Sequence, residues 1–256
     1  MHIIQFVETH AHLDMMKREL KEVIVDARQK GVDKIITIGV DIESCKKNIS
    51  IAERFDNIYT AIGFHPHDSK KMKEEEILLL EEMVAHPKNV AIGEIGLDFY
   101  YNHSAPEVQK KAFRRQIDLA NKYNLPIIIH DRDAHEDTIK ILAEKARGRR
   151  VVLHCFSGDI NMAKWCVEEG FYFGIGGVVT FKNAHTLSKV VQEIPLKSIL
   201  LETDAPFLTP HPYRGKPNEP KYIPIIAEKI AQIKGKSVRE IAQITTENAH
   251  QVFGLS

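Results

Sequence analysis

The stretch IIQFVETHAHLD (residues 3–14) begins with an apolar, β-branched run and ends in polar residues, with no glycine anywhere in it. An open doubly wound sheet would carry a glycine-rich phosphate-binding loop directly after its first strand. This stretch has His10 and His12 at that position instead. It therefore favours a closed α/β barrel, and the open sheet is the main alternative fold.

Seven more apolar runs follow along the chain, and longer amphipathic stretches separate them. The predicted strands are 3–7, 34–40, 57–63, 89–96, 125–130, 150–156, 171–177 and 198–204. The predicted helices are 16–30, 43–55, 74–86, 106–123, 134–146, 159–169 and 183–193, with two more near 221–234 and 237–250. This alternation indicates parallel βαβ units with strands buried on both faces. Eight such units predict a (β/α)8 TIM barrel.

The composition is that of an ordinary globular chain. Of the 256 residues, 43% are apolar and 27% are charged, and no linker rich in proline, glycine or serine divides them. We therefore expect one barrel domain over residues 1–256. Because the formal net charge is zero, a nucleic-acid partner would be held in a local cleft rather than on a broadly basic surface.

The cysteines and the apolar segments bear on the expected compartment. Cys45, Cys155 and Cys166 are scattered and form no C-x-x-C pair, which fits a reducing cytosol. The first residues do not follow the pattern of a signal peptide, and no apolar stretch approaches the roughly 20 residues of a membrane helix. We expect a cytoplasmic protein that has no membrane partner, and we predict no obligate protein partner.

The polar residues suited to chemistry recur at the carboxyl ends of the predicted strands. They are His10, His12, His65, His67, Glu94, Asp98, His130, His154 and Asp204. In a barrel all of these strand ends meet at one rim, where active sites are built. This shared register predicts a single polar site.

The two ends of the chain contribute to the same part of this rim. Side chains alternate along an extended strand, so His10 and His12 point to the same side and can bind one metal ion. Alone, an H-x-H pair is also typical of ordinary surface or core histidines. Asp204 becomes its neighbour if the sheet closes, which strengthens the interpretation as metal ligands.

The middle strands supply three more candidates. Glu94 stands in an apolar strand end between Gly93 and Gly96, and a buried glutamate is normally paired or bound to metal. A carboxylate can bridge two cations, so Glu94 is the candidate bridge; a buried ion pair with an arginine is the alternative. His130 and His154 end two successive strands and are interpreted together as ligands. Imidazole suits zinc, while carboxylates also admit magnesium or manganese.

Nucleophilic catalysis has weaker support in the sequence. Cys155 adjoins His154, but an extended strand would turn its side chain to the opposite face, so we interpret it as a packing residue. A Cys/His pair remains the alternative interpretation. Ser157 lacks the G-x-S-x-G pattern of a serine hydrolase.

The loop after the last predicted strand, APFLTPHPYRGKPNEPKY (residues 205–222), carries Arg214 and Lys216. The planar guanidinium of arginine is suited to phosphate. A solvated, proline-rich loop is the alternative interpretation. Beside a metal site, these cations favour a phosphate ester as the substrate.

Eight motifs together resemble one family. ETHAHLD, GFHPHD, EIGLDFY, LPIIIHDRDA, HCFSG, GFYFGIGG, LLETDAPFLTP and YRGKPNEP occur in the order seen in TatD-family metal-dependent hydrolases, over roughly residues 8 to 253. The resemblance is nearest to the bacterial YabD/YcfH-type members. It implies an amidohydrolase-like TIM barrel that binds two divalent cations and acts as a deoxyribonuclease, with 3′-to-5′ exonuclease activity on single-stranded DNA or RNA.

The resemblance also implies individual roles. His10 and His12 match ligands of the first metal, His130 and His154 match ligands of the second, and Glu94 matches the ligand shared by both. Asp204 matches a ligand that can also act as a base, which makes it, with Glu94, a candidate catalytic residue. His65 and Arg214 match positions that meet the substrate phosphates.

Two departures from the family pattern stand near the first strand. Glu8 replaces the usual aspartate, and its extra methylene is expected to shift a contact to a ligand histidine. Ala11 replaces a frequent cysteine and points away from the histidine pair. Two other functions stay open: an amidohydrolase-like enzyme for small amides or phosphoesters, and a non-catalytic metal or nucleic-acid binding module. The neutral charge and the complete ligand set argue against the second.

Overall fold

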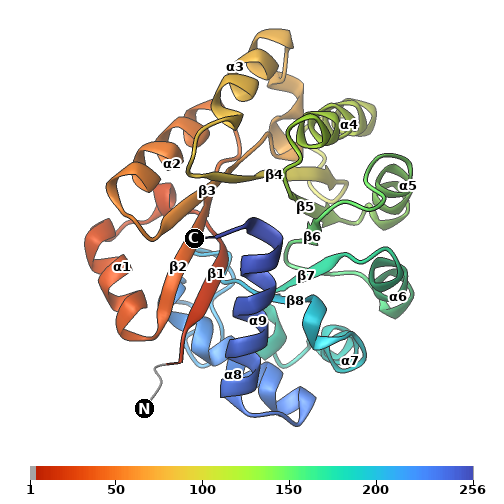
Figure 1. Ribbon diagram of the computed structural model, residues 1–256. Coiled ribbons are helices and arrows are strands. Elements are labelled where there is room, and N and C mark those ends of the chain that lie inside the picture. The colour runs from red at the N-terminus through yellow and green to blue at the C-terminus, as the bar shows by residue number, and fades with distance from the viewer. Residues whose placement is uncertain (1–3, 256) are drawn as a thin grey trace.

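The computed structural model describes residues 4–255, and its eight strands form one parallel sheet in the order β1 to β8 (Figure 1). The strands are β1 (Phe6–Ala11), β2 (Val32–Ile38), β3 (Ile58–Ile62), β4 (Asn89–Asp98), β5 (Ile127–Arg132), β6 (Val151–Leu153), β7 (Tyr172–Ile175) and β8 (Ile199–Leu201). The first and last strands meet directly after β8: His12 N–H donates to the Ala205 carbonyl (2.7 Å), and Asp204 N–H donates to the His10 carbonyl (2.9 Å). These contacts confirm the predicted TIM barrel and bring the two ends of the chain together.

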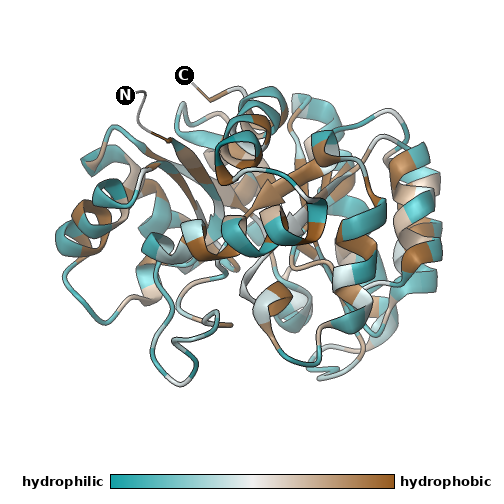
Figure 2. Cartoon of the chain, turned by 90° about the horizontal axis from the view of Figure 1, so that it is seen from below, coloured by the Kyte–Doolittle hydropathy of each residue, from teal (hydrophilic) through white to brown (hydrophobic). Residues whose placement is uncertain are grey.

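Helices follow the strands and surround the sheet (Figure 1). They are α1 (Leu20–Gln29), α2 (Ile42–Arg54), α3 (Glu74–Val84), α4 (Pro106–Tyr123), α5 (His135–Lys145), α6 (Ile160–Glu168), α7 (His185–Glu193), α8 (Ile223–Lys234) and α9 (Val238–Phe253). Asp41, Asp159 and Ser237 cap α2, α6 and α9 through side-chain hydrogen bonds to free backbone N–H groups. Figure 2 shows hydrophobic strands inside and largely hydrophilic outer helix faces.

Every predicted strand and helix is present, but several boundaries differ. β1 continues to Ala11, so His10 lies within the strand rather than after it. β6 and β8 are short and end at Leu153 and Leu201, before the polar residues that the sequence placed on them. Ile3, at the start of the first predicted strand, lies outside the described residues.

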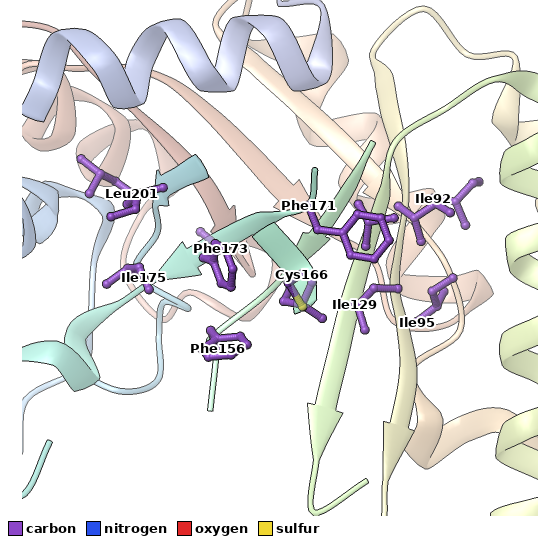
Figure 3. Packing of buried hydrophobic residues seen from close by; sticks show 14 of the residues in the cluster. Ile92, Ile95, Ile129, Phe156, Cys166, Phe171, Phe173, Ile175 and Leu201 are labelled. Carbon is purple, nitrogen blue, oxygen red and sulfur yellow. The ribbon is translucent and has the colours of Figure 1, made fainter. Parts of the chain in front are cut away.

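Two apolar layers hold the barrel. One lies between the sheet and the helices; Figure 3 shows part of it, in which the rings of Phe156 and Phe173 meet edge to face at 5.0 Å. The second fills the barrel interior, where Val7 and Ile36 pack with Val252 and Phe253 of α9.

The last helix, α9, closes the amino-terminal end of the barrel. The Thr246 hydroxyl donates to the Gln5 carbonyl (3.1 Å), and Asn248 Nδ2 donates to the Ile199 carbonyl (2.8 Å). Both acceptors stand at the beginning of a strand. The carboxyl ends of the strands therefore remain the open rim. Within residues 4–255, none of the helices is both long and apolar enough to cross a membrane.

Candidate metal centre

Glu94 lies at the centre of the open rim, on β4, and is only 3% exposed. Its two carboxylate oxygens face different sets of imidazoles. Oε2 lies 3.4 Å from Nε2 of His10 and 3.9 Å from Nε2 of His12. Oε1 lies 2.7 Å from Nδ1 of His130 and faces two more imidazoles, at 3.7 Å in His65 and 3.8 Å in His154. The rim thus brings the four predicted histidine ligands together around the carboxylate of Glu94.

The glycines beside Glu94 allow the neighbouring strand to come close. Gly96 has a φ of 141°, and a Cβ there would lie 2.0 Å from the His130 carbonyl oxygen. Only glycine fits this combination of backbone angle and space. This glycine therefore lets β5, which carries His130, lie close to the strand of Glu94.

The first group of candidate ligands comes from the two ends of the chain. Nε2 of His12 lies 3.4 Å from Oδ1 of Asp204, and Nε2 of His10 lies 4.0 Å from the same oxygen. Asp204 follows the end of β8 and adopts a left-handed backbone conformation with a φ of 57°. That turn directs its carboxylate toward the β1 histidines, and nitrogen and oxygen atoms of all three side chains lie within 4.8 Å of one another.

His10 shows that this group suits a cation. The side chain is fully buried, and neither ring nitrogen has a hydrogen-bond partner among residues 4–255. Unpaired buried nitrogens are unfavourable unless something binds them. Burial and the neighbouring His154 lower the pKa of His10, so the neutral ring keeps a lone pair for a metal.

The second group is held by hydrogen bonds between its own members. His130 contacts Oε1 of Glu94 through Nδ1 (2.7 Å) and Oδ2 of Asp98 through Nε2 (3.0 Å). Burial lowers the pKa of His130, but the two carboxylates outweigh it and raise the pKa to about 9. His67 contacts the same Asp98 oxygen at 2.9 Å. Asp98 and His67, both noted at strand ends in the sequence, thus support the site.

Glu202, which the sequence analysis did not single out, contacts the candidate ligand His154. It is fully buried; its Oε1 accepts a hydrogen bond from Cys155 N–H (2.6 Å) and lies 3.0 Å from Nδ1 of His154. Burial lowers the pKa of His154, yet Glu202 and Glu94 raise it to about 10. A Cβ on Gly174 would lie 2.1 Å from Oε2 of Glu202, so this glycine makes the space. The available signal in the sequence was a glutamate that directly follows the apolar run at 199–201.

Glu8 bonds the backbone rather than a ligand side chain. Its Oε1 accepts hydrogen bonds from the N–H groups of His10 (3.0 Å) and Thr203 (2.9 Å). Burial raises the pKa of Glu8 to about 8. Glu8 thus ties β1 to the segment that carries Asp204, and the expected contact to a histidine ring is not what the structure shows.

Cys155 differs from its expected placement. β6 ends at Leu153, and Cys155 takes a left-handed φ of 44°, so strand alternation does not apply to it. Its sulfur lies within 4.8 Å of ligand atoms of His154 and Glu202. Burial, followed by the nearby carboxylates, raises the pKa of the thiol well above its ordinary value. This environment disfavours a thiolate nucleophile.

A cavity of about 350 Å³ opens over the centre. His65 lines it, together with the apolar and aromatic side chains of Met15, Tyr101 and Phe207. Arg214 does not line this cavity: its guanidinium lies 4.1 Å from the centre of the Phe181 ring and donates to the Thr209 carbonyl (3.2 Å).

Known proteins share this sequence and fold. The family model described as TatD related DNase matches residues 7–254. The uncharacterized metal-dependent hydrolase YabD of Bacillus subtilis is 47% identical, over 97% of this chain and 99% of the relative. The 3′-5′ ssDNA/RNA exonuclease TatD of Escherichia fergusonii is 36% identical, over 93% and 94%.

A solved structure agrees over the whole length. The TatD homolog YJJV of Escherichia coli superposes with a TM-score of 0.93 at 31% identity, covering 99% of this chain and 100% of that structure. The eight-stranded barrel, the ring of imidazoles and carboxylates at its rim and these matches agree with one another. The chain belongs to the TatD family of metal-dependent hydrolases.

Proposed function

We propose that this protein is a nuclease that uses two divalent cations to hydrolyse phosphodiester bonds in single-stranded nucleic acid. The observation that supports it most is that Oε2 of Glu94 lies nearest His10 and Oε1 lies nearest His130. His154 lies between the two, with Nε2 at 3.8 Å from both Oε1 of Glu94 and Oδ1 of Asp204. One cation would be held by His10, His12, Glu94 and Asp204, and the other by Glu94, His130 and His154. This donor set of imidazoles and carboxylates admits zinc, manganese or magnesium.

Bound cations at such a site polarise a phosphoryl oxygen and make water a stronger nucleophile. The chain supplies the proton acceptor. Burial alone would raise the pKa of Asp204, but His12 and His154 outweigh it and keep the pKa below its ordinary value. Because its pKa is lowered, the carboxylate of Asp204 is ionised at neutral pH. It lines the cavity and is therefore accessible to water. Oδ1 of Asp204 would accept a proton from the attacking water.

His65 would contact the substrate phosphate as a neutral hydrogen-bond donor. It lines the cavity, and burial lowers the pKa of its ring to about 3. Arg214 could contact the substrate phosphate only if its guanidinium moved away from the ring of Phe181. The choice of nucleic acid as substrate is supported by the TatD related DNase model and by the relative named as an exonuclease.

The test is cleavage of single-stranded DNA and RNA, labelled at the 5′ or the 3′ end, with magnesium, manganese or zinc. We expect stepwise shortening from the 3′ end, and a loss on the order of 10³-fold or more in Glu94→Gln. Glu228→Gln, an exposed glutamate on α8, is the matched control and should behave like the wild type. Full activity in Glu94→Gln, or hydrolysis of small amides without cleavage of nucleic acid, would contradict the proposal.

A further inference from the structure

A second cavity, of about 420 Å³, adjoins the one over the metal centre. Met15 and Phe207 line both cavities, so these two side chains form a shared wall. Phe207 is 50% exposed and Met15 is 39% exposed, which is unusual for large apolar side chains beside a polar centre. The ring of Phe207 meets the ring of His12 edge to face at 5.9 Å. The second cavity therefore begins one side chain away from a candidate metal ligand.

The backbone holds Phe207 firmly in this wall. Phe207 N–H donates to the Asp204 carbonyl (2.8 Å), and Nδ2 of Asn218 donates to the carbonyls of Phe207 (2.5 Å) and Thr203 (2.7 Å). Asn218 is itself buried. The backbone of Phe207 is thus tied to that of Asp204, the residue that would accept the proton, and its exposed ring offers a flat surface beside it.

The charges around the second cavity are mainly positive. Lys17, Arg18 and Lys216 line it with one acidic side chain, Glu219. Oε2 of Glu219 is neutralised by Arg18 (2.6 Å) and by Lys221 (3.0 Å). Within the described part of the chain, Lys17 has no ion pair or hydrogen bond from its ammonium, and the ammonium of Lys216 contacts only the Tyr213 ring, at 5.7 Å. Two lysines are therefore available to an anion.

We propose that this second cavity binds the nucleotide next to the scissile phosphate, with its base stacked on Phe207 and its outer phosphate near Lys17 and Lys216. The inference rests on the proposed nuclease function and adds a subsite to it. Stacking on aromatic rings and neutralisation by cations are the two interactions that hold single-stranded nucleic acid. Phe207 provides the aromatic ring, and Lys17 and Lys216 provide the cations. The metal centre, Phe207 and the lysines would then meet the scissile phosphate, the base and the next phosphate of one strand, in that order.

The first test compares two substrates in steady-state kinetics. Hexathymidylate is long enough to enter both cavities, whereas methyl p-nitrophenyl phosphate has no second nucleotide to place in the second cavity. We expect Phe207→Ala to raise KM for hexathymidylate about 5- to 100-fold, the range of one stacked base, and to change kcat less than about threefold. Because Phe207 also lines the metal cavity, its loss can affect the small diester too, but the rise in KM for hexathymidylate should be the larger of the two, and Phe207→Trp should restore KM. Tyr123→Ala, a surface aromatic on α4, is the control.

The second test measures binding, so that it also works if no substrate is cleaved. Fluorescence anisotropy of labelled hexathymidylate should show that Lys17→Ala with Lys216→Ala lowers the slope of log Kd against log salt by about 0.7, the value for one phosphate contact in a single strand. If hexathymidylate binds, is not cleaved and binds more weakly to Phe207→Ala, the nuclease function is refuted but the nucleotide-binding subsite is supported.

Three results would overturn the subsite. They are the absence of hexathymidylate binding, an equal loss of activity on both substrates in Phe207→Ala, and an unchanged salt slope in the lysine double variant. Equal loss would mean that Phe207 only supports His12. A second copy of the chain is the alternative occupant of the cavity, and sedimentation of the protein alone tests for it. A dimer that is lost in Phe207→Ala would assign the cavity to that second copy.

Discussion

The two halves of the metal centre meet the same carboxylate but are built differently. The β1–β8 half consists of His10, His12 and Asp204, and both ring nitrogens of His10 lack a hydrogen-bond partner among the described residues. The other half consists of His130 on β5 and His154 after β6, and both ring nitrogens of His130 already contact carboxylates. In the first half the His10 ring is free of hydrogen bonds to the described residues and a cation must open only the contact between His12 and Asp204, whereas in the second it must displace both hydrogen bonds and a proton from His130. We infer that the β1–β8 half binds its cation more tightly.

The largest effect is expected when one histidine is removed from each half of the metal centre. His10→Ala should weaken the tighter metal site by at least about 100-fold, because loss of a ligand costs more than loss of a residue that merely orients one. His130→Ala should leave that site nearly unchanged and weaken only the second. Isothermal titration with manganese or zinc measures both. The surface variant His86→Ala is the control, and equal effects of the two substitutions would contradict the asymmetry.

A smaller effect is expected from the carboxylates that support the rings. Glu202→Gln removes the charge beside Nδ1 of His154, and Asp98→Asn removes the charge shared by His67 and His130. Each should weaken metal binding about 10- to 100-fold while leaving the fold intact, as judged by circular dichroism. Gly174→Ala tests the same support without changing a charge, since its Cβ would displace Glu202. If all three variants bind metal within twofold of the wild type, Glu202 and Asp98 do not support the ligand histidines.

The smallest effect concerns stability. A ligand that binds only the folded chain stabilises it by about 2.7 kcal/mol at a concentration 100 times its Kd. For a chain of this size that corresponds to a rise in Tm of roughly 5–10 °C. We expect the rise to come in two steps as metal is titrated, and His10→Ala to abolish the first step. A single step at all metal concentrations would indicate that the two halves do not differ.

The sequence predicted the barrel and the convergence of its ligands because apolar strands and their polar ends recur in register. It could not predict how the chain turns after the short strands β6 and β8. The left-handed residues Cys155 and Asp204 direct their side chains by backbone geometry that strand alternation does not describe. Glu202 was missed for a related reason, since its partners come from β7 and the end of β6.

The outer loop was equally hard to predict. Its prolines and cations indicated phosphate binding by Arg214, but the guanidinium lies on Phe181. The residue of that loop that reaches the cavity is Phe207, which the sequence analysis did not single out. Tertiary packing, rather than residue type, decides which side chain of a loop faces a site.

The central claim is that Glu94 joins two cations, and anomalous diffraction from crystals loaded with manganese or zinc tests it most directly. We predict two anomalous peaks about 3.5–4 Å apart, one beside each oxygen of Glu94, with His10 and His12 at one peak and His130 and His154 at the other. A single peak at saturating metal, or two peaks that do not share Glu94, would contradict it.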